Sequence, residues 1–130
     1  MPHTRDVVLA IDDDAVRLAL TFALSTMGLA VQLACDGDAL LAAAARGCGC
    51  IVLDQGRGGI DPGPLLRSMR DLGLAVPVVA LVRAWDRPMR GRALRTGVAR
   101  VLEYPIVDRS LLDAIVAACR GSTRLCPPVP

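Results

Sequence analysis

Residues 7–17 read VVLAIDDDAVR, so that three consecutive carboxylates, Asp12, Asp13 and Asp14, follow directly on an apolar run. A short run of Val, Leu and Ile is typical of a strand that is buried on both faces of a parallel sheet. The stretch after the aspartates carries apolar side chains at helical spacing and stops at Gly28, a residue that suits the left-handed turn after a helix. The sequence therefore predicts a strand, an acidic loop and a helix.

The same alternation of apolar run and helical pattern recurs along the chain. Further runs of strand length occupy residues 30–34, 50–53, 78–82 and 101–102. Later helical patterns begin near Asp61, Asp86 and Arg109 and end near Gly73, Gly97 and Gly121. Five β–α units predict one α/β domain over residues 1–121, because right-handed crossovers lay helices on both faces of a parallel sheet. Residues 122–130 are predicted to be a proline-rich tail or the start of a linker.

The composition fits one domain with an aliphatic core. The chain of 130 residues is 53% hydrophobic but only 2% aromatic, so Ala, Leu and Val must fill the interior. It has no apolar run of about 20 residues that could span a membrane, and its N-terminus lacks the pattern of a signal peptide. These features predict a soluble, cytoplasmic protein.

Charge and cysteine content exclude several kinds of site. Five cysteines, an odd number without framework spacing, predict reduced thiols, and a single histidine argues against a zinc site. A net charge of +2 and the scarcity of aromatic residues argue against nucleic-acid binding. All fifteen basic residues are Arg, which excludes any mechanism that requires a lysine.

Carboxylates follow two of the predicted strands. Asp12, Asp13 and Asp14 follow the first strand and Asp54 follows the third, and ligands of open α/β sheets bind beyond such carboxyl ends. Clustered carboxylates repel one another unless their pKa values rise or a cation binds between them. Mg²⁺, held by one or two carboxylates, a carbonyl and waters, is the cation that suits them. A second explanation is that Asp13 or Asp14 only caps the first helix.

These blocks resemble the receiver domain of two-component response regulators, the CheY-like family, and within it the FixJ-type subgroup. The resemblance covers about residues 6–120 and is carried by IDDDAVR, CIVLDQGRGGIDPGPLLRSMR, VPVVALV, WDRPMRGRALRTGVARVLEYPI and SLLDAIVAA. It implies a flavodoxin-like fold, a five-stranded parallel sheet of order 2-1-3-4-5 with five helices on its two faces. It also implies a phosphoprotein of phosphorelay signal transduction, not an enzyme that turns over a separate substrate.

The resemblance also implies the residues of a site. Asp54 stands at the phosphoacceptor position, and Mg²⁺ would be bound by Asp13, Asp54 and the carbonyl of Gly56, with Asp12 shaping its water shell. The first loop is about one residue short, so a second register puts Ile11 and Asp12 at the paired acidic positions. The register with Asp12 and Asp13 is preferred here because it keeps the apolar run intact.

The sequence departs from the family at the residues that contact the phosphoryl group. Val82 stands where the family has Ser or Thr, Tyr104 where it has Lys, and Val101 where it has an aromatic switch residue. A valine donates no hydrogen bond and a neutral phenol does not replace a cation. We therefore expect an atypical receiver, which accepts phosphoryl on Asp54 weakly or acts as a pseudo-receiver through protein contacts.

Partners and an alternative function follow from the same residues. The expected partner is a histidine kinase or another signalling protein, with a homodimer through the fourth helix, fifth strand and fifth helix, and no nucleic acid or membrane. Arg83 could fold back toward Asp54 and partly replace the missing cation, although a guanidinium is larger and stiffer than an ammonium. The alternative function is that of a small flavodoxin-like protein that binds a nucleotide or flavin at the same rim.

Overall fold

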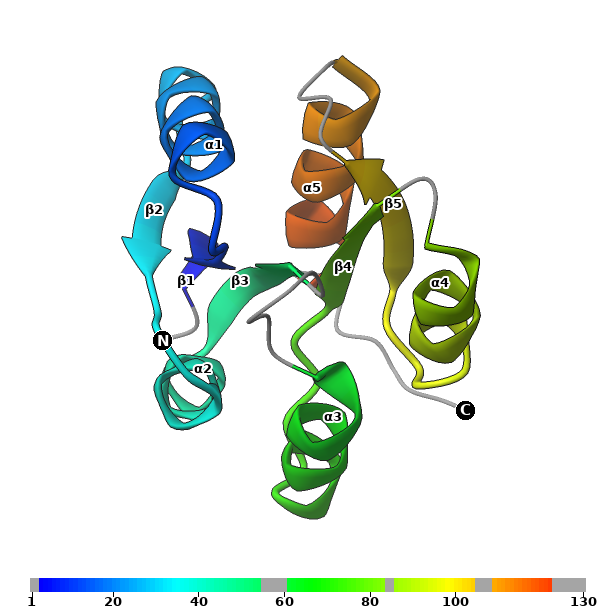
Figure 1. Ribbon diagram of the computed structural model, residues 1–130. Coiled ribbons are helices and arrows are strands. Elements are labelled where there is room, and N and C mark those ends of the chain that lie inside the picture. The colour runs from blue at the N-terminus through cyan, green and yellow to red at the C-terminus, as the bar shows by residue number, and fades with distance from the viewer. Residues whose placement is uncertain (1–2, 55–60, 84–85, 105–108, 123–130) are drawn as a thin grey trace.

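The computed structural model describes residues 3–54, 61–83, 86–104 and 109–122, in which strands and helices alternate (Figure 1). The strands are β1 (His3–Ala10), β2 (Ala30–Leu33), β3 (Cys48–Asp54), β4 (Val78–Arg83) and β5 (Arg100–Tyr104). The helices are α1 (Asp14–Thr26), α2 (Gly37–Arg46), α3 (Pro62–Asp71), α4 (Arg87–Leu94) and α5 (Arg109–Ser122). The expected tail lies outside the described residues from residue 123 onward.

All five strands pair in parallel in the order β2-β1-β3-β4-β5, which confirms the predicted fold. From β1 the chain crosses to β2 on one side, and β3 then starts the series β3-β4-β5 on the other side. The strand order therefore reverses between β1 and β3, and ligands of such sheets bind beyond the carboxyl ends of the two strands at this point. The loop after β1 and the end of β3 lie there.

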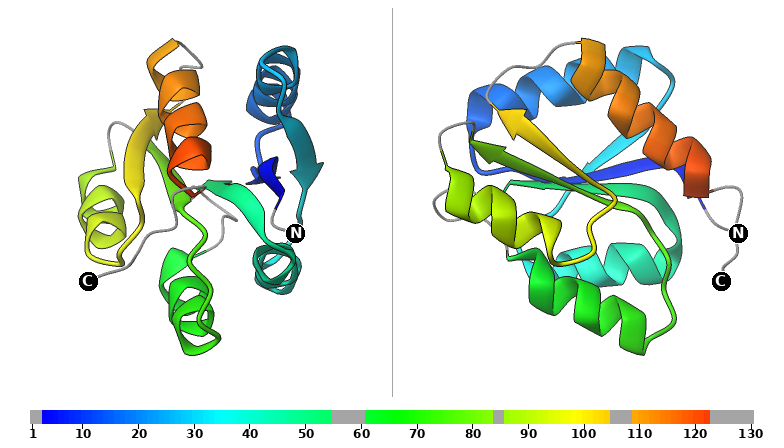
Figure 2. Two further views of the ribbon diagram at one scale, coloured as in Figure 1. Left: turned by 180° about the vertical axis from the view of Figure 1, so that it is seen from behind. Right: turned by 90° about the vertical axis from the view of Figure 1, so that its right-hand side faces the viewer.

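Two hydrophobic layers hold the helices on the sheet. Figure 2 shows α1 and α5 on one face and α2, α3 and α4 on the other. The layer under α1 and α5 contains Val7, Leu9, Ile11, Val16, Leu20, Leu24, Cys50, Val52, Val79, Leu81, Ile115 and Cys119. The opposite layer contains Val8, Ala10, Leu40, Ala43, Ala44, Cys48, Ile51, Leu53, Leu65, Met69, Val78, Ala80, Val82 and Ala93. Successive residues of β1, β3 and β4 thus enter opposite layers, as the two-residue period of a strand requires.

Aspartates fix the starts of four helices. The side chains of Asp13, Asp36, Asp61 and Asp86 accept hydrogen bonds from backbone N–H groups in the first turns of α1, α2, α3 and α4. Each carboxylate satisfies a donor that the helix itself leaves unpaired. The predicted starts near Asp61 and Asp86 are thereby confirmed, and so is the helix-capping explanation for Asp13.

Helix ends lie within three residues of the glycines predicted to end them, and α4 ends at Leu94, three residues before Gly97. Gly28 and Gly73 adopt φ values of 85° and 71°, in the left-handed region that glycine enters without strain, just after α1 and α3. Helix α5 continues to Ser122, one residue past Gly121. A glycine in the last turn of a helix lowers stability little, because that turn frays, so a glycine does not by itself set the helix boundary.

Among the described residues, none of the helices combines the length and the hydropathy that a membrane span requires.

Three of the described cysteines have buried thiols. Cys48 and Cys50 are buried in β3 and Cys119 is buried in α5, and none of the described cysteines forms a disulfide. A hydrogen bond with Cys119 and burial raise the pKa of Cys50 well above its ordinary value, and the same hydrogen bond lowers the pKa of Cys119. Burial raises the pKa of Cys48 to about 11.

The raised pKa of Cys48 predicts a loss of stability in alkali. The folded protein holds the thiol proton above the pH at which the unfolded chain releases it, so this contribution is complete below pH 9 and is lost as the pH rises toward 11. We expect wild type to lose on the order of 2 kcal/mol more unfolding free energy across this range than Cys48→Ala does. Urea unfolding at several pH values measures it. Cys35→Ala, which removes an exposed thiol, should lose as much unfolding free energy across this pH range as wild type does. An equal dependence of unfolding free energy on pH in all three proteins would contradict the prediction.

Candidate functional site

Asp54 is the last residue of β3 and the one buried charged or polar residue in the described part of the chain, with 1% of its surface exposed. Its backbone pairs with Leu81 of β4. On the other side Leu53 pairs with Ala10, so the next residue of the β1 strand line, Ile11, is level with Asp54. The carboxylate therefore lies at the reversal of strand order, between two apolar neighbours.

The loop after β1 holds its three aspartates in different environments. Asp12 is exposed. Oδ1 of Asp13 accepts a hydrogen bond of 3.2 Å from the backbone N–H of Val16, so this carboxylate lies at the N-terminus of α1. Asp14 is exposed and forms an ion pair with Arg17.

Arg17 also ties this loop to the helix. Its Nη1 donates a hydrogen bond of 3.1 Å to the carbonyl oxygen of Ile11. Ile11 itself is 5% exposed and packs into the layer under α1 and α5. The end of β1 therefore carries an apolar side chain where the loop begins, and the acidic side chains start one residue later.

The strand pairing favours the second register of this loop over the preferred one. The sequence favoured Asp12 and Asp13 as the paired acidic residues, but the pairing of Ala10 with Leu53 puts Ile11 level with Asp54. Asp12 and Asp13 then lie one and two residues farther along, at about 3 Å per residue. Asp12 is the first carboxylate beyond the level of Asp54, and Asp13 caps α1. The second register, with Ile11 and Asp12 beside the acceptor, agrees with this geometry.

The carboxylates of the site suit a cation that keeps most of its coordinated water molecules. Among the described residues, no three side chains of His, Cys, Asp or Glu are grouped closely enough to hold a metal ion. Asp54 lies at the carboxyl end of β3, and the exposed Asp12 follows the carboxyl end of the neighbouring strand β1. Mg²⁺ is commonly bound by one or two carboxylates with several waters. Gly56, whose carbonyl was expected to complete the set, lies outside the described residues.

Of the three positions that depart from the family, Val82 and Tyr104 lie near the carboxyl ends of β4 and β5, and Val101 lies near the start of β5. Val82 is 1% exposed, is the next residue after the partner of Asp54, and packs in the layer under α2, α3 and α4. Tyr104 ends β5, where its backbone pairs with Arg83. Val101 is partly buried against the same layer as Val82. Val82 and Val101 carry no hydroxyl group, and Tyr104 carries a neutral phenol in place of an ammonium group.

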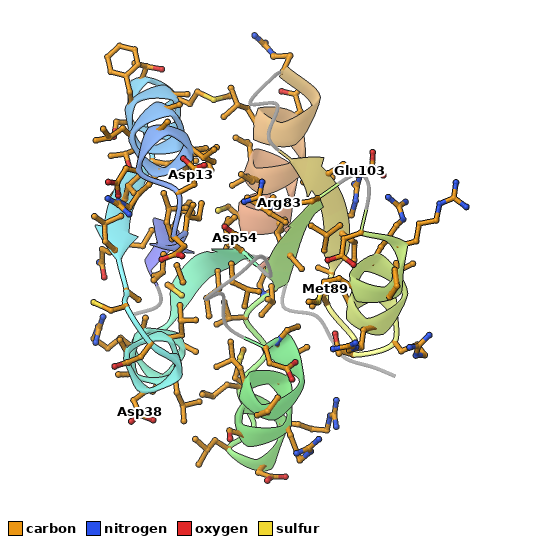
Figure 3. The ribbon with its side chains drawn as sticks, viewed as in Figure 1. Asp13, Asp38, Asp54, Arg83, Met89 and Glu103 are labelled. Atoms are coloured by element: carbon orange, nitrogen blue, oxygen red, sulfur yellow. The ribbon has the colours of Figure 1, made fainter. Side chains whose placement is uncertain are left out.

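Two arginines gain a role that the sequence did not settle. Figure 3 shows Arg83 at the end of β4, on the same edge of the sheet as Asp54 and Asp13, with its side chain extending over the strand ends toward Asp54. Arg90 of α4 forms an ion pair of 2.6 Å with Glu103 of β5. Both residues of that pair are about half exposed. No sequence pattern indicated this ion pair, because its partners are thirteen residues apart and belong to different elements.

Comparison with known proteins identifies related chains. The sequence profile of the response regulator receiver domain matches residues 7–116. Transcriptional regulatory protein FixJ of Azorhizobium caulinodans is 37% identical over 123 residues, which cover 94% of this chain and 56% of that protein. Response regulator protein TodT of Pseudomonas putida is 29% identical over 122 residues, which cover 92% of this chain and 54% of that protein. The chain thus spans about half the length of these relatives.

Solved structures agree with the sequence relatives. The crystal structure of FixJ-N aligns with a TM-score of 0.76 at 27% identity, covering 95% of this chain and 97% of that one. The response regulator StyR aligns with a TM-score of 0.74 at 26% identity, covering 91% of this chain and 60% of that one. The similarity to both includes all five β–α units, since more than nine-tenths of the present chain is aligned.

Proposed function

Because this chain belongs to the response regulator receiver domain family, we propose that Asp54 accepts a phosphoryl group in two-component signal transduction. The observation that carries the proposal is the place of Asp54: a buried carboxylate at the carboxyl end of β3, where the strand order of the sheet reverses. Receiver domains act as signal transducers, and the chain's similarity to response regulators disfavours the alternative of a nucleotide- or flavin-binding protein.

The proposed reaction is an in-line transfer from a phosphohistidine of a histidine kinase. An oxygen of the Asp54 carboxylate forms a bond to phosphorus while the bond from phosphorus to the imidazole nitrogen breaks. That nitrogen keeps the electron pair, and Asp54 becomes an acyl phosphate. Little covalent chemistry is needed from the protein, so its contribution is to position the carboxylate and to stabilise charge on the phosphoryl oxygens.

Mg²⁺ would neutralise part of the charge on the transferred group when it is bound. In this chain Asp12 and Asp54 would hold it, with the carbonyl of Gly56 as the further ligand that the family resemblance implies. Asp13 was proposed as a direct ligand, but its Oδ1 already accepts the hydrogen bond from Val16. We therefore assign Asp13 a supporting role, as a negative charge beside the site and as the cap that fixes the start of α1.

The departures at the end of β4 and β5 make this an atypical receiver. Val82 offers the phosphoryl group no hydroxyl and Tyr104 offers no ammonium, so transfer and the conformational response should both be weak. The Arg90–Glu103 ion pair links α4 to β5 in the unmodified protein. A homodimer through α4, β5 and α5 remains our proposal for association, and a histidine kinase remains the proposed partner.

Intact-mass spectrometry after incubation with acetyl phosphate and Mg²⁺ tests the acceptor role. We expect wild type to gain the mass of one phosphoryl group and Asp54→Asn to gain none, because the amide is no nucleophile. Asp38→Asn is the matched control, since Asp38 is exposed on α2 and lies away from the site (Figure 3). Failure of wild type to gain mass with Mg²⁺ present would rule out the acceptor role and leave the pseudo-receiver, which acts through protein contacts.

A further inference from the structure

Arg83 and Asp54 share one face of the sheet. Asp54 follows Val52 by two residues and Arg83 follows Leu81 by two residues, and both Val52 and Leu81 belong to the layer under α1 and α5. Because side chains alternate along a strand, Asp54 and Arg83 continue these two rows on the same face. The guanidinium therefore enters the site from the α1 side, where the acidic loop also lies.

The separation of the two residues suits an arginine. Asp54 pairs with Leu81, so Arg83 lies one strand across and two residues farther along. With strands about 4.8 Å apart and a rise of about 3.3 Å per residue, the backbones of Asp54 and Arg83 are about 8 Å apart. In the view of Figure 3 the Arg83 side chain extends from the end of β4 in the direction of Asp54. An arginine side chain that extends back along the sheet is long enough to bring its cation to the carboxylate across this separation.

The surroundings of Asp54 call for a positive charge. The carboxylate is 1% exposed and is flanked by Ile11 and Leu81, which offer it no polar group from their side chains. A buried ionised group is stable only when it is paired or hydrogen-bonded. The chain contains no lysine, so an arginine must supply any permanent side-chain cation.

Three other arginines form ion pairs with carboxylates away from Asp54. Arg17 pairs with Asp14, Arg90 with Glu103, and Arg109 with Asp113. Arg83 is partly buried and stands at the strand end beside the acceptor. Its position follows that of Val82, where the hydroxyl is missing, and its backbone pairs with Tyr104, where the ammonium is missing.

We propose that Arg83 is the resident cation of this site, a positioning residue whose guanidinium pairs with the Asp54 carboxylate in the unmodified protein. After transfer, the same group would contact the phosphoryl oxygens; that second part rests on the proposed function. A guanidinium presents several N–H donors in a fixed plane and keeps its charge at every accessible pH. It competes with Mg²⁺ for the carboxylate, because both cations are attracted to the same two oxygens.

A double-mutant cycle tests the pairing without any phosphoryl transfer. Urea unfolding without Mg²⁺ is measured for wild type, Arg83→Met, Asp54→Asn and the double variant. We expect Arg83→Met to lower the folding equilibrium constant about tenfold in wild type and less than about twofold in the Asp54→Asn background. Arg83→Lys should recover part of the loss. Arg87→Met, at an exposed residue of α4, is the control and should be additive with Asp54→Asn.

The effect of Mg²⁺ separates this role from a merely structural one. We expect Arg83→Met to lower the Mg²⁺ concentration needed for half-maximal thermal stabilisation about tenfold, since the competing cation is gone. The proposal would be overturned if the stability effects of Arg83→Met and Asp54→Asn were additive. It would also be overturned if Arg83→Met left the Mg²⁺ concentration for half-maximal stabilisation unchanged or raised it. If the cycle shows coupling but wild type takes up no phosphoryl group, the proposed function fails and the pairing stands. If wild type is phosphorylated but the cycle is additive, the pairing fails and the proposed function stands.

Discussion

The double variant Val82→Thr with Tyr104→Lys is expected to take up a phosphoryl group from acetyl phosphate roughly 10- to 100-fold faster than wild type. Val82 stands where the family resemblance implies a Ser or Thr that contacts the phosphoryl group, so a threonine there would supply that hydroxyl. A lysine at the end of β5 would add a cation. Both groups would contact oxygens whose negative charge grows in the transition state, which is where added donors accelerate a reaction.

The time course of intact mass at fixed Mg²⁺ measures this rate. Val82→Thr with Tyr104→Met is the matched control, because methionine is nearly as long as lysine but carries no charge. We expect the control to gain only the part that the hydroxyl contributes. Equal rates for wild type and the lysine variant would contradict the view that these two positions limit the reaction. Urea unfolding of each variant shows whether the buried hydroxyl at position 82 has reduced stability, since that position is 1% exposed.

Asp12→Asn and Asp13→Asn should separate metal binding from helix capping. Asp12 is exposed and first beyond the level of Asp54, so its replacement should raise the Mg²⁺ concentration for half-maximal stabilisation by roughly a hundredfold, because a direct charged ligand is lost. Asparagine is also a good N-cap, so Asp13→Asn should change this concentration less than about tenfold and leave stability nearly unchanged.

Asp13→Ala completes this comparison. It removes the side-chain acceptor for the Val16 N–H and should cost about 1 kcal/mol of unfolding free energy, a typical cost of losing an N-cap. Thermal unfolding over a series of Mg²⁺ concentrations reports both quantities for all three variants. If Asp13→Asn weakened the Mg²⁺ effect as much as Asp12→Asn, Asp13 would be a direct ligand as the family resemblance first implied.

The site also shows what the missing contacts imply for signalling. The family resemblance implies that a hydroxyl at the position of Val82 and an aromatic ring at that of Val101 couple phosphorylation to output, and this chain has valine at both. The proposed pairing of Arg83 supplies a positive charge beside Asp54. It does not supply the hydroxyl whose movement would follow phosphorylation. The Arg90–Glu103 pair is about half exposed, and exposed pairs contribute about 1 kcal/mol or less. It therefore biases the position of α4 only slightly and does not replace the missing coupling.

The sequence by itself determined the elements and most of their ends. Apolar runs of Val, Ile and Leu predicted the strands, and aspartates such as Asp61 and Asp86 predicted helix starts. These features depend on local periodicity and on side chains that bond to the backbone a few residues away, so they can be read without knowledge of the rest of the chain. The same reasoning placed Asp54 at a strand end, where the structure also has it.

Only the tertiary structure decided how the parts of the site face one another. The register of β1 against β3 put Ile11 level with Asp54 and moved Asp12 into the first acidic position beyond it. That register is set by side chains packed on both faces of the sheet, and a change of one residue would turn every one of them to the opposite layer. The direction of Arg83 likewise depends on which face of β4 it continues, which the pairing of strands far apart in the chain determines.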